Sequence, residues 1–88
     1  MITLIDFYAD WCGPCQAMKP VFDKVMPEFS GKVTLEKVNV DSDQAKAGQY
    51  SVMSIPTMVI LKDGKEVDRK IGMLPEPMFK QWLQSHTS

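Results

Sequence analysis

The stretch Ala9–Pro20, ADWCGPCQAMKP, holds both cysteines of this chain, Cys12 and Cys15, with only Gly13 and Pro14 between them. A Cys-x-x-Cys pair can serve as a structural disulfide, as part of a metal site or as a redox-active dithiol. The residues on either side predict where the fold places the two thiols, and that placement separates the three uses.

Apolar residues on both sides of this stretch predict a strand followed by a helix. Residues 2–8, ITLIDFY, are β-branched or aromatic at both parities apart from Asp6, as expected of a central strand covered on both faces. From Cys12 to about Phe29, apolar residues recur at the spacing of one helix face, and Pro27 should end or bend that helix. The cysteines therefore lie where the strand ends and the helix begins.

The rest of the chain predicts three more strands and two more helices. The strands are expected at residues 33–40, 57–62 and 66–71, and the helices at 43–50 and 76–86. Asp63-Gly64 is a strong hairpin signal between the last two strands. The order β-α-β-α-β-β-α predicts an α/β fold in which the first two strands, joined by a helix, pair in parallel.

Length and charge restrict the classes of function. The chain has 88 residues and a net charge of -1, which predicts a single domain over residues 1–88 and gives no reason to expect nucleic acid or an anionic membrane as partner. No apolar run approaches the roughly 18 residues of a membrane span, and the sequence shows no signal peptide. Two cysteines are too few for a secreted disulfide scaffold, so we expect a reducing compartment, the cytoplasm.

The three uses of the cysteine pair are not equally supported. A disulfide across so short a loop adds only about 2 kcal/mol of stability. Structural zinc usually takes four protein ligands, whereas this chain offers two cysteines and one histidine, His86. Redox chemistry fits best, because Cys12 lies at the positive end of the predicted helix dipole, which favours a thiolate. Cys15 lies one turn further in, on the apolar helix face, and should be the shielded thiol.

Several segments together resemble the thioredoxin family. They are DFYADWCGPCQAMKP, KVNVD, SIPT, KDGK and IG, in this order, and they cover nearly the whole chain. The resemblance implies the thioredoxin fold, a four-stranded mixed sheet flanked by three helices, with the cysteine-bearing and C-terminal helices on one face and the short helix on the other. Typical members begin with a further strand and helix, so we expect a short, minimal thioredoxin whose residues 33–40 form a sheet edge.

The resemblance also implies an activity and its partners. It makes Cys12 the nucleophile and Cys15 the resolving thiol of a dithiol-disulfide oxidoreductase, and the Gly13-Pro14 spacer favours reduction of protein disulfides. The expected partners are disulfide-containing protein substrates and a thioredoxin reductase that depends on NADPH or ferredoxin. No metal or cofactor beyond the redox-active Cys12–Cys15 disulfide is expected, and the chain should act as a monomer.

Two charged residues are expected to support the thiols. Asp6 shares the parity of Leu4, so it should point into the core beneath the cysteine-bearing helix, although a strand-end aspartate could instead reach solvent. Burial would raise the pKa of Asp6 towards neutrality, which would allow this carboxylate to take the proton of Cys15. The resemblance makes Lys37 the cation paired with Asp6, and an exposed strand lysine is the alternative.

Substrate contacts are expected around the cysteines. The predicted set is Trp11, Gly13, Pro14, Ile55, Pro56, Gly72 and Met73. Pro56 corresponds to the cis-proline of the family, which would leave the backbone of Ile55 free to pair with an extended peptide. The absent side chain of Gly72 would let substrate approach. Met53 and Met73 could line the groove with adaptable apolar surface.

Two other classes of function stay open. A redox-inactive binding module that kept the thioredoxin fold would show negligible turnover. A metal-bridged dimer would carry stoichiometric zinc or an iron-sulfur cluster. His86 has no partner in the sequence pattern and is expected to be solvated, while Met18, Met26, Met58 and Met78 are expected to pack in the core.

Overall fold

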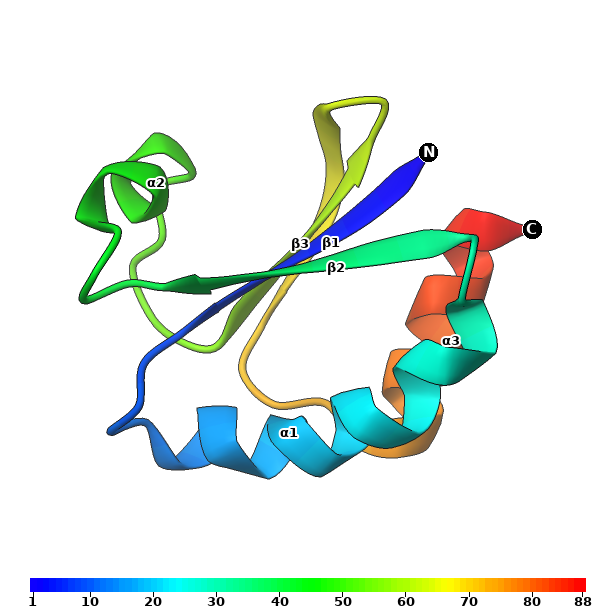
Figure 1. Ribbon diagram of the computed structural model, residues 1–88, viewed down its shortest axis with the longest axis horizontal. Coiled ribbons are helices and arrows are strands. Elements are labelled where there is room, and N and C mark those ends of the chain that lie inside the picture. Colours follow the sequence, from blue (N-terminus) through cyan, green and yellow to red (C-terminus); the bar gives the residue numbers. More distant parts are fainter.

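A computed structural model describes residues 1–88 as a four-stranded sheet with helices on both faces (Figure 1). The elements are β1 (Ile2–Tyr8), α1 (Gly13–Val25), the 3₁₀ helix η1 (Met26–Phe29), β2 (Val33–Asn39), α2 (Gln44–Gln49), β3 (Thr57–Lys62), β4 (Lys65–Ile71) and α3 (Glu76–Thr87). Their order is the predicted one, with η1 as an addition where Pro27 tightens the end of the first helix. The other bounds agree with the prediction within one residue.

The sheet has the strand order β2-β1-β3-β4. β1 pairs in parallel with β2 and antiparallel with β3, and β3 pairs antiparallel with β4. The predicted parallel pair and hairpin are therefore confirmed. β1 is central because it is apolar on both faces, and β2 is an edge strand, also as predicted.

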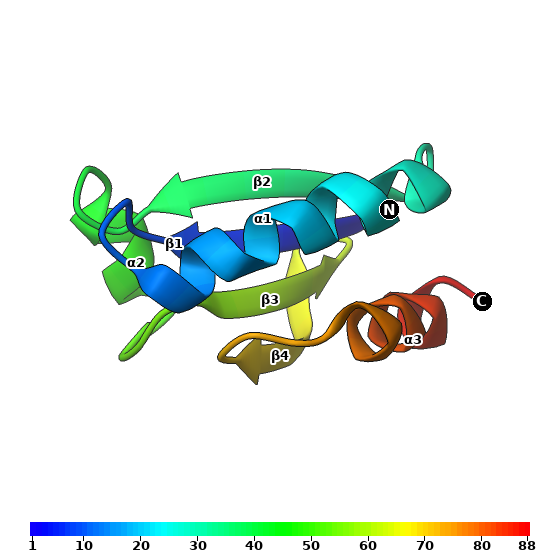
Figure 2. The same cartoon turned by 90° about the horizontal axis from the view of Figure 1, so that it is seen from below.

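Helices α1 and α3 cover one face of the sheet, and α2 covers the other (Figures 1 and 2). The larger core lies under α1 and α3, where the rings of Phe22 and Phe79 meet edge to face with centroids 5.3 Å apart. The smaller core lies under α2 and contains Ile5, Phe7, Val38 and Val59. The residues on each side alternate along β1, as strand geometry requires.

Two turns depend on left-handed backbone. Asp63 and Gly64 have φ values of 52° and 84°, the conformation of a two-residue hairpin loop whose twist matches the flanking strands. Gly72 has a φ of 94° where β4 ends, a conformation that glycine adopts without strain.

His86 is not solvated, and that prediction was wrong. Its Nε2 lies 2.9 Å from Oδ2 of Asp68 on β4, and the same oxygen accepts a 2.8 Å hydrogen bond from Nε1 of Trp82. Trp82 and His86 are four residues apart on α3 and therefore share the helix face that packs against β4. These contacts join the C-terminal helix to the sheet.

One of the methionines also departs from expectation. Met18 and Met58 are fully buried and Met26 is partly buried, but Met78 is 55% exposed. Met78 precedes the buried Phe79 at the start of α3, so its side chain lies beside the inward face and not on it.

Candidate active site

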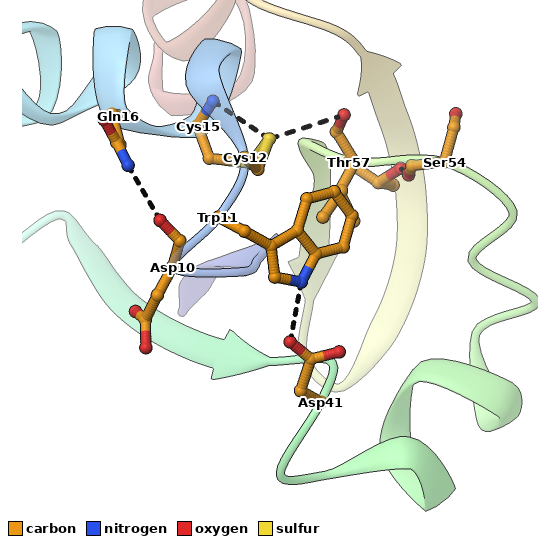
Figure 3. Close-up of a disulfide and its surroundings, with 9 residues drawn as sticks. Asp10, Trp11, Cys12, Cys15, Gln16, Asp41, Ser54 and Thr57 are labelled. Carbon is orange, nitrogen blue, oxygen red and sulfur yellow. Dashed lines mark hydrogen bonds between the residues drawn. A yellow bond between two sulfur atoms is a disulfide. The ribbon is translucent and has the colours of Figure 1, made fainter.

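Cys12 is the N-cap of α1, in the short connection that follows the central strand β1, which ends at Tyr8. It forms a disulfide with Cys15, with their Cα atoms 5.2 Å apart (Figure 3). The backbone N–H of Cys15 donates a 3.2 Å hydrogen bond to Sγ of Cys12. In the reduced protein, such an amide at a helix N-terminus stabilises negative charge on the sulfur of Cys12.

The relative exposure of the two cysteines is the reverse of the prediction. Cys12 is only 4% exposed, whereas Cys15 is partly exposed. Cys12 is covered by a segment far away in the sequence, because its Sγ lies 3.9 Å from the carbonyl oxygen of Ile55. The expectation that Cys15 is the shielded thiol was therefore wrong.

Cys15 opens into a polar cavity of about 450 Å³. The lining residues are Asp6, Tyr8, Ala9, Asp10, Cys15, Gln16, Lys19 and Lys37. Gln16 closes one side, since its Nε2 donates a 2.7 Å hydrogen bond to the backbone carbonyl of Asp10 (Figure 3). Cys15, in the first turn of α1, and Asp6, on the central strand, therefore line the same cavity, which is open to solvent.

Asp6 is buried, as the strand parity predicts. Only 4% of the residue is exposed, and its Oδ1 has no hydrogen-bond partner. Burial raises the pKa of Asp6 from 3.8 to about 6, against the opposing effect of the positive charge on Lys37. A carboxyl group with this pKa can both accept and release a proton near neutral pH.

Lys37 lies directly opposite Asp6 in the β1–β2 register, but its residue is exposed. Its Nζ lies 5.4 Å from the ring centroid of Phe22 and 5.8 Å from that of Tyr8, and no ion pair joins it to Asp6. Lys37 is thus the exposed strand lysine of the alternative reading. It still lines the same cavity and lowers the pKa of Asp6.

The Ile55–Pro56 peptide bond is cis, as the family resemblance predicts. The carbonyl oxygen of Pro56 accepts a 2.8 Å hydrogen bond from the backbone N–H of Gly72, so the two segments lie side by side. The backbone of Ile55 takes no part in the hydrogen bonds of the turns and loops. Its N–H has no backbone partner there, and its carbonyl oxygen has only the 3.9 Å contact with Sγ of Cys12.

Trp11 extends the site on the other side of the disulfide. Its side chain is 70% exposed, and its Nε1 donates a 2.8 Å hydrogen bond to Oδ2 of Asp41 (Figure 3). Sequence reasoning missed this partner. The signal was present, because Trp11 and Asp41 follow the carboxyl ends of two parallel strands, which meet at one edge of the sheet.

An apolar hollow of about 390 Å³ lies beside Trp11. It is lined by Trp11, Val40, Ala47, Val52, Met53, Ser54 and Ile55. Met53 is 93% exposed and Met73 is 45% exposed, so both methionines expected at the groove do reach the surface. Ala47 and Val52 were not singled out from the sequence, because nothing local indicates that α2 faces Trp11.

The remaining predicted contact residues are exposed or leave open space. Gly13 and Pro14 are exposed between the cysteines. A Cβ atom on Gly72 would meet nothing within 4 Å, so the chain itself leaves space there, and its positive φ is what favours glycine. The structure gathers no group of three or more His, Cys, Asp or Glu side chains that could hold a metal ion.

Known proteins similar to this chain identify its family. Residues 1–85 match the family described as Thioredoxin. A thioredoxin from Haemophilus influenzae is 45% identical over 83 residues, which cover 94% of this chain and 78% of that protein. A thioredoxin from Staphylococcus aureus is 39% identical over 85 residues, which cover 97% of this chain and 82% of that protein. The chain therefore belongs to the thioredoxin family.

A solved structure supports the same assignment. A mutant thioredoxin from Halobacterium salinarum superposes with a TM-score of 0.91 at 38% identity, covering 99% of this chain and 75% of that chain. The predicted thioredoxin fold, with its four-stranded mixed sheet and three helices, is confirmed. Together with the bonded cysteine pair, family membership makes the chain a thiol-disulfide oxidoreductase of the protein-disulfide reductase type. None of its helices has the length and apolar character needed to cross a bilayer.

Proposed function

We propose that this chain reduces disulfide bonds in protein substrates through its Cys12-Gly13-Pro14-Cys15 dithiol. The observation that carries the proposal is the position of Cys12 at the N-terminus of α1, where its Sγ accepts the backbone N–H of Cys15. This contact lowers the pKa of a thiol, and the thiolate is the form that attacks a disulfide.

In the first step, the Cys12 thiolate attacks one sulfur of the substrate disulfide. The substrate S–S bond breaks, a mixed disulfide forms with Cys12, and the other substrate sulfur leaves as a thiolate that takes a proton from solvent. The low exposure of Cys12 does not prevent this step if the substrate strand docks beside Ile55, whose backbone lies next to Sγ and makes no hydrogen bond to another backbone group of the turns and loops.

In the second step, Cys15 resolves the mixed disulfide. Asp6 takes the proton of the Cys15 thiol, and the resulting thiolate attacks Sγ of Cys12. The bond between Cys12 and the substrate breaks, the second substrate sulfur leaves reduced, and the Cys12–Cys15 disulfide forms. Two electrons have passed from the dithiol to the substrate. The shared cavity supports this role, because water within it can carry the proton between Cys15 and Asp6.

Lys37 acts on the second step through its charge. It stands opposite Asp6 across the parallel strands and favours the ionised carboxylate, so it keeps the pKa of Asp6 from rising further. Because no ion pair joins the two residues, Lys37 changes the pKa of Asp6 and does not hold its carboxylate in position.

Substrate binding combines backbone pairing with apolar contact. An extended peptide would pair with Ile55 beside the cis Pro56, as peptides do when they add to exposed backbone. Further contacts would come from the exposed or open positions around the disulfide, Trp11, Gly13, Pro14, Gly72 and Met73.

The proposed cycle needs one further partner. Each turnover leaves the Cys12–Cys15 disulfide, so a reductase that draws on NADPH or ferredoxin must supply two electrons. The chain would act as a monomeric single domain in the reducing cytoplasm, with no metal and no cofactor besides this disulfide.

The test is the reduction of insulin with dithiothreitol as electron source. The parent chain should accelerate the reaction, and Cys12→Ser should lower the rate to that of dithiothreitol alone. Ala17→Ser, an exposed position one turn into α1, is the matched control and should keep the parent rate. A Cys12→Ser protein that works as well as the parent would refute the mechanism. A parent with bound zinc or iron and no turnover would instead favour the metal-bridged module.

A further inference from the structure

Arg69 forms a clamp on the face of the sheet opposite the cysteine-bearing helix. It pairs with Val59 across β3 and β4, and Val59 belongs to the core under α2. Its Nη2 donates a 2.9 Å hydrogen bond to the backbone carbonyl of Tyr50, and its Nε and Nη2 donate to the two carboxylate oxygens of Glu66 at 2.6 and 2.7 Å. The carboxylate fork holds the guanidinium in one orientation, aimed at Tyr50.

Tyr50 is the C-cap of α2, where the chain leaves the helix. The next residue, Ser51, has a φ of 54°, and the N–H of Val52 reaches back 3.0 Å to the carbonyl of Ala47. Carbonyl groups at a helix end lack partners within the helix. Arg69 supplies the donor for the carbonyl of Tyr50 from a different element of the fold.

The segment from Ser51 to Ile55 begins at this clamp and ends at the disulfide. At its far end, Oγ1 of Thr57 donates a 2.6 Å hydrogen bond to the carbonyl of Ser54. Between the two ties, Val52 and Met53 line the apolar hollow beside Trp11, and the carbonyl of Ile55 lies against Cys12. The hydrogen bond from Arg69 to the carbonyl of Tyr50 therefore holds the end of the 51–55 segment that is next to α2, and this segment would receive the substrate.

We propose that Arg69 is a positioning residue for substrate docking. By holding the carbonyl of Tyr50, it fixes the start of the 51–55 segment, so that the hollow and the backbone of Ile55 beside Cys12 are preformed before substrate arrives. The inference rests on the proposed function, because it assumes that this segment receives the substrate peptide. Preformed backbone lowers the ordering cost of binding, and its effect should fall on affinity and not on the thiol chemistry.

The experiment measures the oxidation of the pre-reduced protein by insulin over a range of insulin concentrations, followed by tryptophan fluorescence. Arg69→Ala should raise the half-saturating insulin concentration about fivefold, as expected for the loss of one charge-assisted hydrogen bond, while the maximal rate changes less than about twofold. Oxidation by cystamine, a small disulfide without a peptide, should keep the parent rate. Arg69→Lys, which keeps one donor but not the fork, should fall between parent and Arg69→Ala.

Asp68→Ala is the matched control. Asp68 is the neighbouring residue of β4, and its side chain contacts Trp82 and His86 of α3 on the other face of the sheet. It should lower thermal stability without changing the half-saturating concentration. The half-saturating insulin concentration could rise equally in Asp68→Ala, or oxidation of Arg69→Ala by cystamine could slow equally. Either result would mean that a general loss of stability causes the effect, and it would overturn the inference. An unchanged half-saturating insulin concentration in Arg69→Ala would overturn the inference as well. The proposed function would still hold in that case, provided that the parent protein reduces insulin.

Discussion

Two aspartates, Asp6 on β1 and Asp68 on β4, occupy opposite electrostatic environments in this chain. Asp6 is 4% exposed, has an oxygen without a hydrogen-bond partner, and has its pKa raised to about 6 by burial. Asp68 accepts hydrogen bonds from Trp82 and from the backbone N–H of Arg69 and contacts His86. The hydrogen bond from Trp82 is the main reason that the pKa of Asp68 is lowered.

The difference separates a carboxylate that can exchange protons from one that holds elements together. A buried carboxyl group without partners destabilises its own charged form, so it titrates near the pH at which a thiol must be deprotonated. A carboxylate with several donors stays ionised and stabilises the fold. The chain keeps the unfavourable arrangement at the position that shares a cavity with Cys15.

The largest expected effect is on stability at Asp6. The pKa of Asp6 is raised from 3.8 to about 6, so the folded protein binds one more proton than the unfolded chain between these pH values. The contribution of Asp6 to the free energy of unfolding is therefore full below pH 3.8 and is lost as the pH rises through 6. Asp6→Asn removes this loss and should raise the free energy of unfolding at pH 7 by up to about 3 kcal/mol. Urea unfolding of both proteins from pH 4 to 8 measures it.

The advantage of Asp6→Asn should grow between pH 4 and 6 and stay level above pH 7. A constant difference at every pH would show that Asp6 does not titrate in this range, and the contrast with Asp68 would lose its basis.

The second effect is on the rate of resolution. A free thiol with a pKa near 8.5 is only about 3% ionised at pH 7, so a base can accelerate the attack by Cys15 at most about 30-fold. We expect Asp6→Asn to slow the release of substrate from the mixed disulfide about tenfold at pH 7, measured by stopped-flow mixing. Above about pH 9 the thiol ionises unaided, and the two proteins should converge.

Asp10→Asn is the control for this measurement, because Asp10 lines the same cavity but is exposed. It should resolve the mixed disulfide at the parent rate. Equal slowing in Asp10→Asn and Asp6→Asn would assign the effect to the charge of the cavity and not to the buried base.

The smallest effect is expected at Asp68. Asp68→Ala leaves Nε1 of Trp82 without its acceptor and should lower the free energy of unfolding by about 1 kcal/mol, near the low end for charged hydrogen bonds because the carboxylate is partly exposed. The lowered pKa of Asp68 gives the opposite sign from Asp6, since its contribution is present above pH 3.8 and is lost as the pH falls further. Thermal unfolding at pH 3 and pH 7 checks it. A larger loss at pH 3 than at pH 7 would contradict it.

Local patterns were enough to predict the elements and their order, whereas the face of the sheet that each helix covers was predicted from the resemblance to the thioredoxin family. Apolar runs and helical spacing predicted each strand and α-helix, and the parity of β1 predicted that Asp6 is buried. The 3₁₀ helix η1 was not predicted, because a proline near a helix end signals an interruption without saying what geometry follows.

Residue patterns alone predicted the site only where neighbouring residues determine it, and the cis Ile55–Pro56 bond was predicted from the family resemblance. The exposure of Cys12 depends on Ile55, 43 residues away, and so helix position alone ranked the two thiols in the wrong order. The partner of His86 likewise lies on β4, and the Tyr50 carbonyl that Arg69 binds lies at the end of α2. Pairings of this kind need the tertiary arrangement, because no sequence spacing encodes which exposed polar groups will meet.

The most direct test concerns which thiol attacks, since the more exposed cysteine is the one assigned to resolve. Cys15→Ser and Cys12→Ser are each reduced, incubated with insulin and analysed by intact-protein mass spectrometry. We predict that Cys15→Ser accumulates a covalent adduct through Cys12, because that sulfur receives the helix N-terminal amide and lies beside the backbone of Ile55, the proposed docking site of the substrate. An adduct on Cys12→Ser, with none on Cys15→Ser, would contradict it.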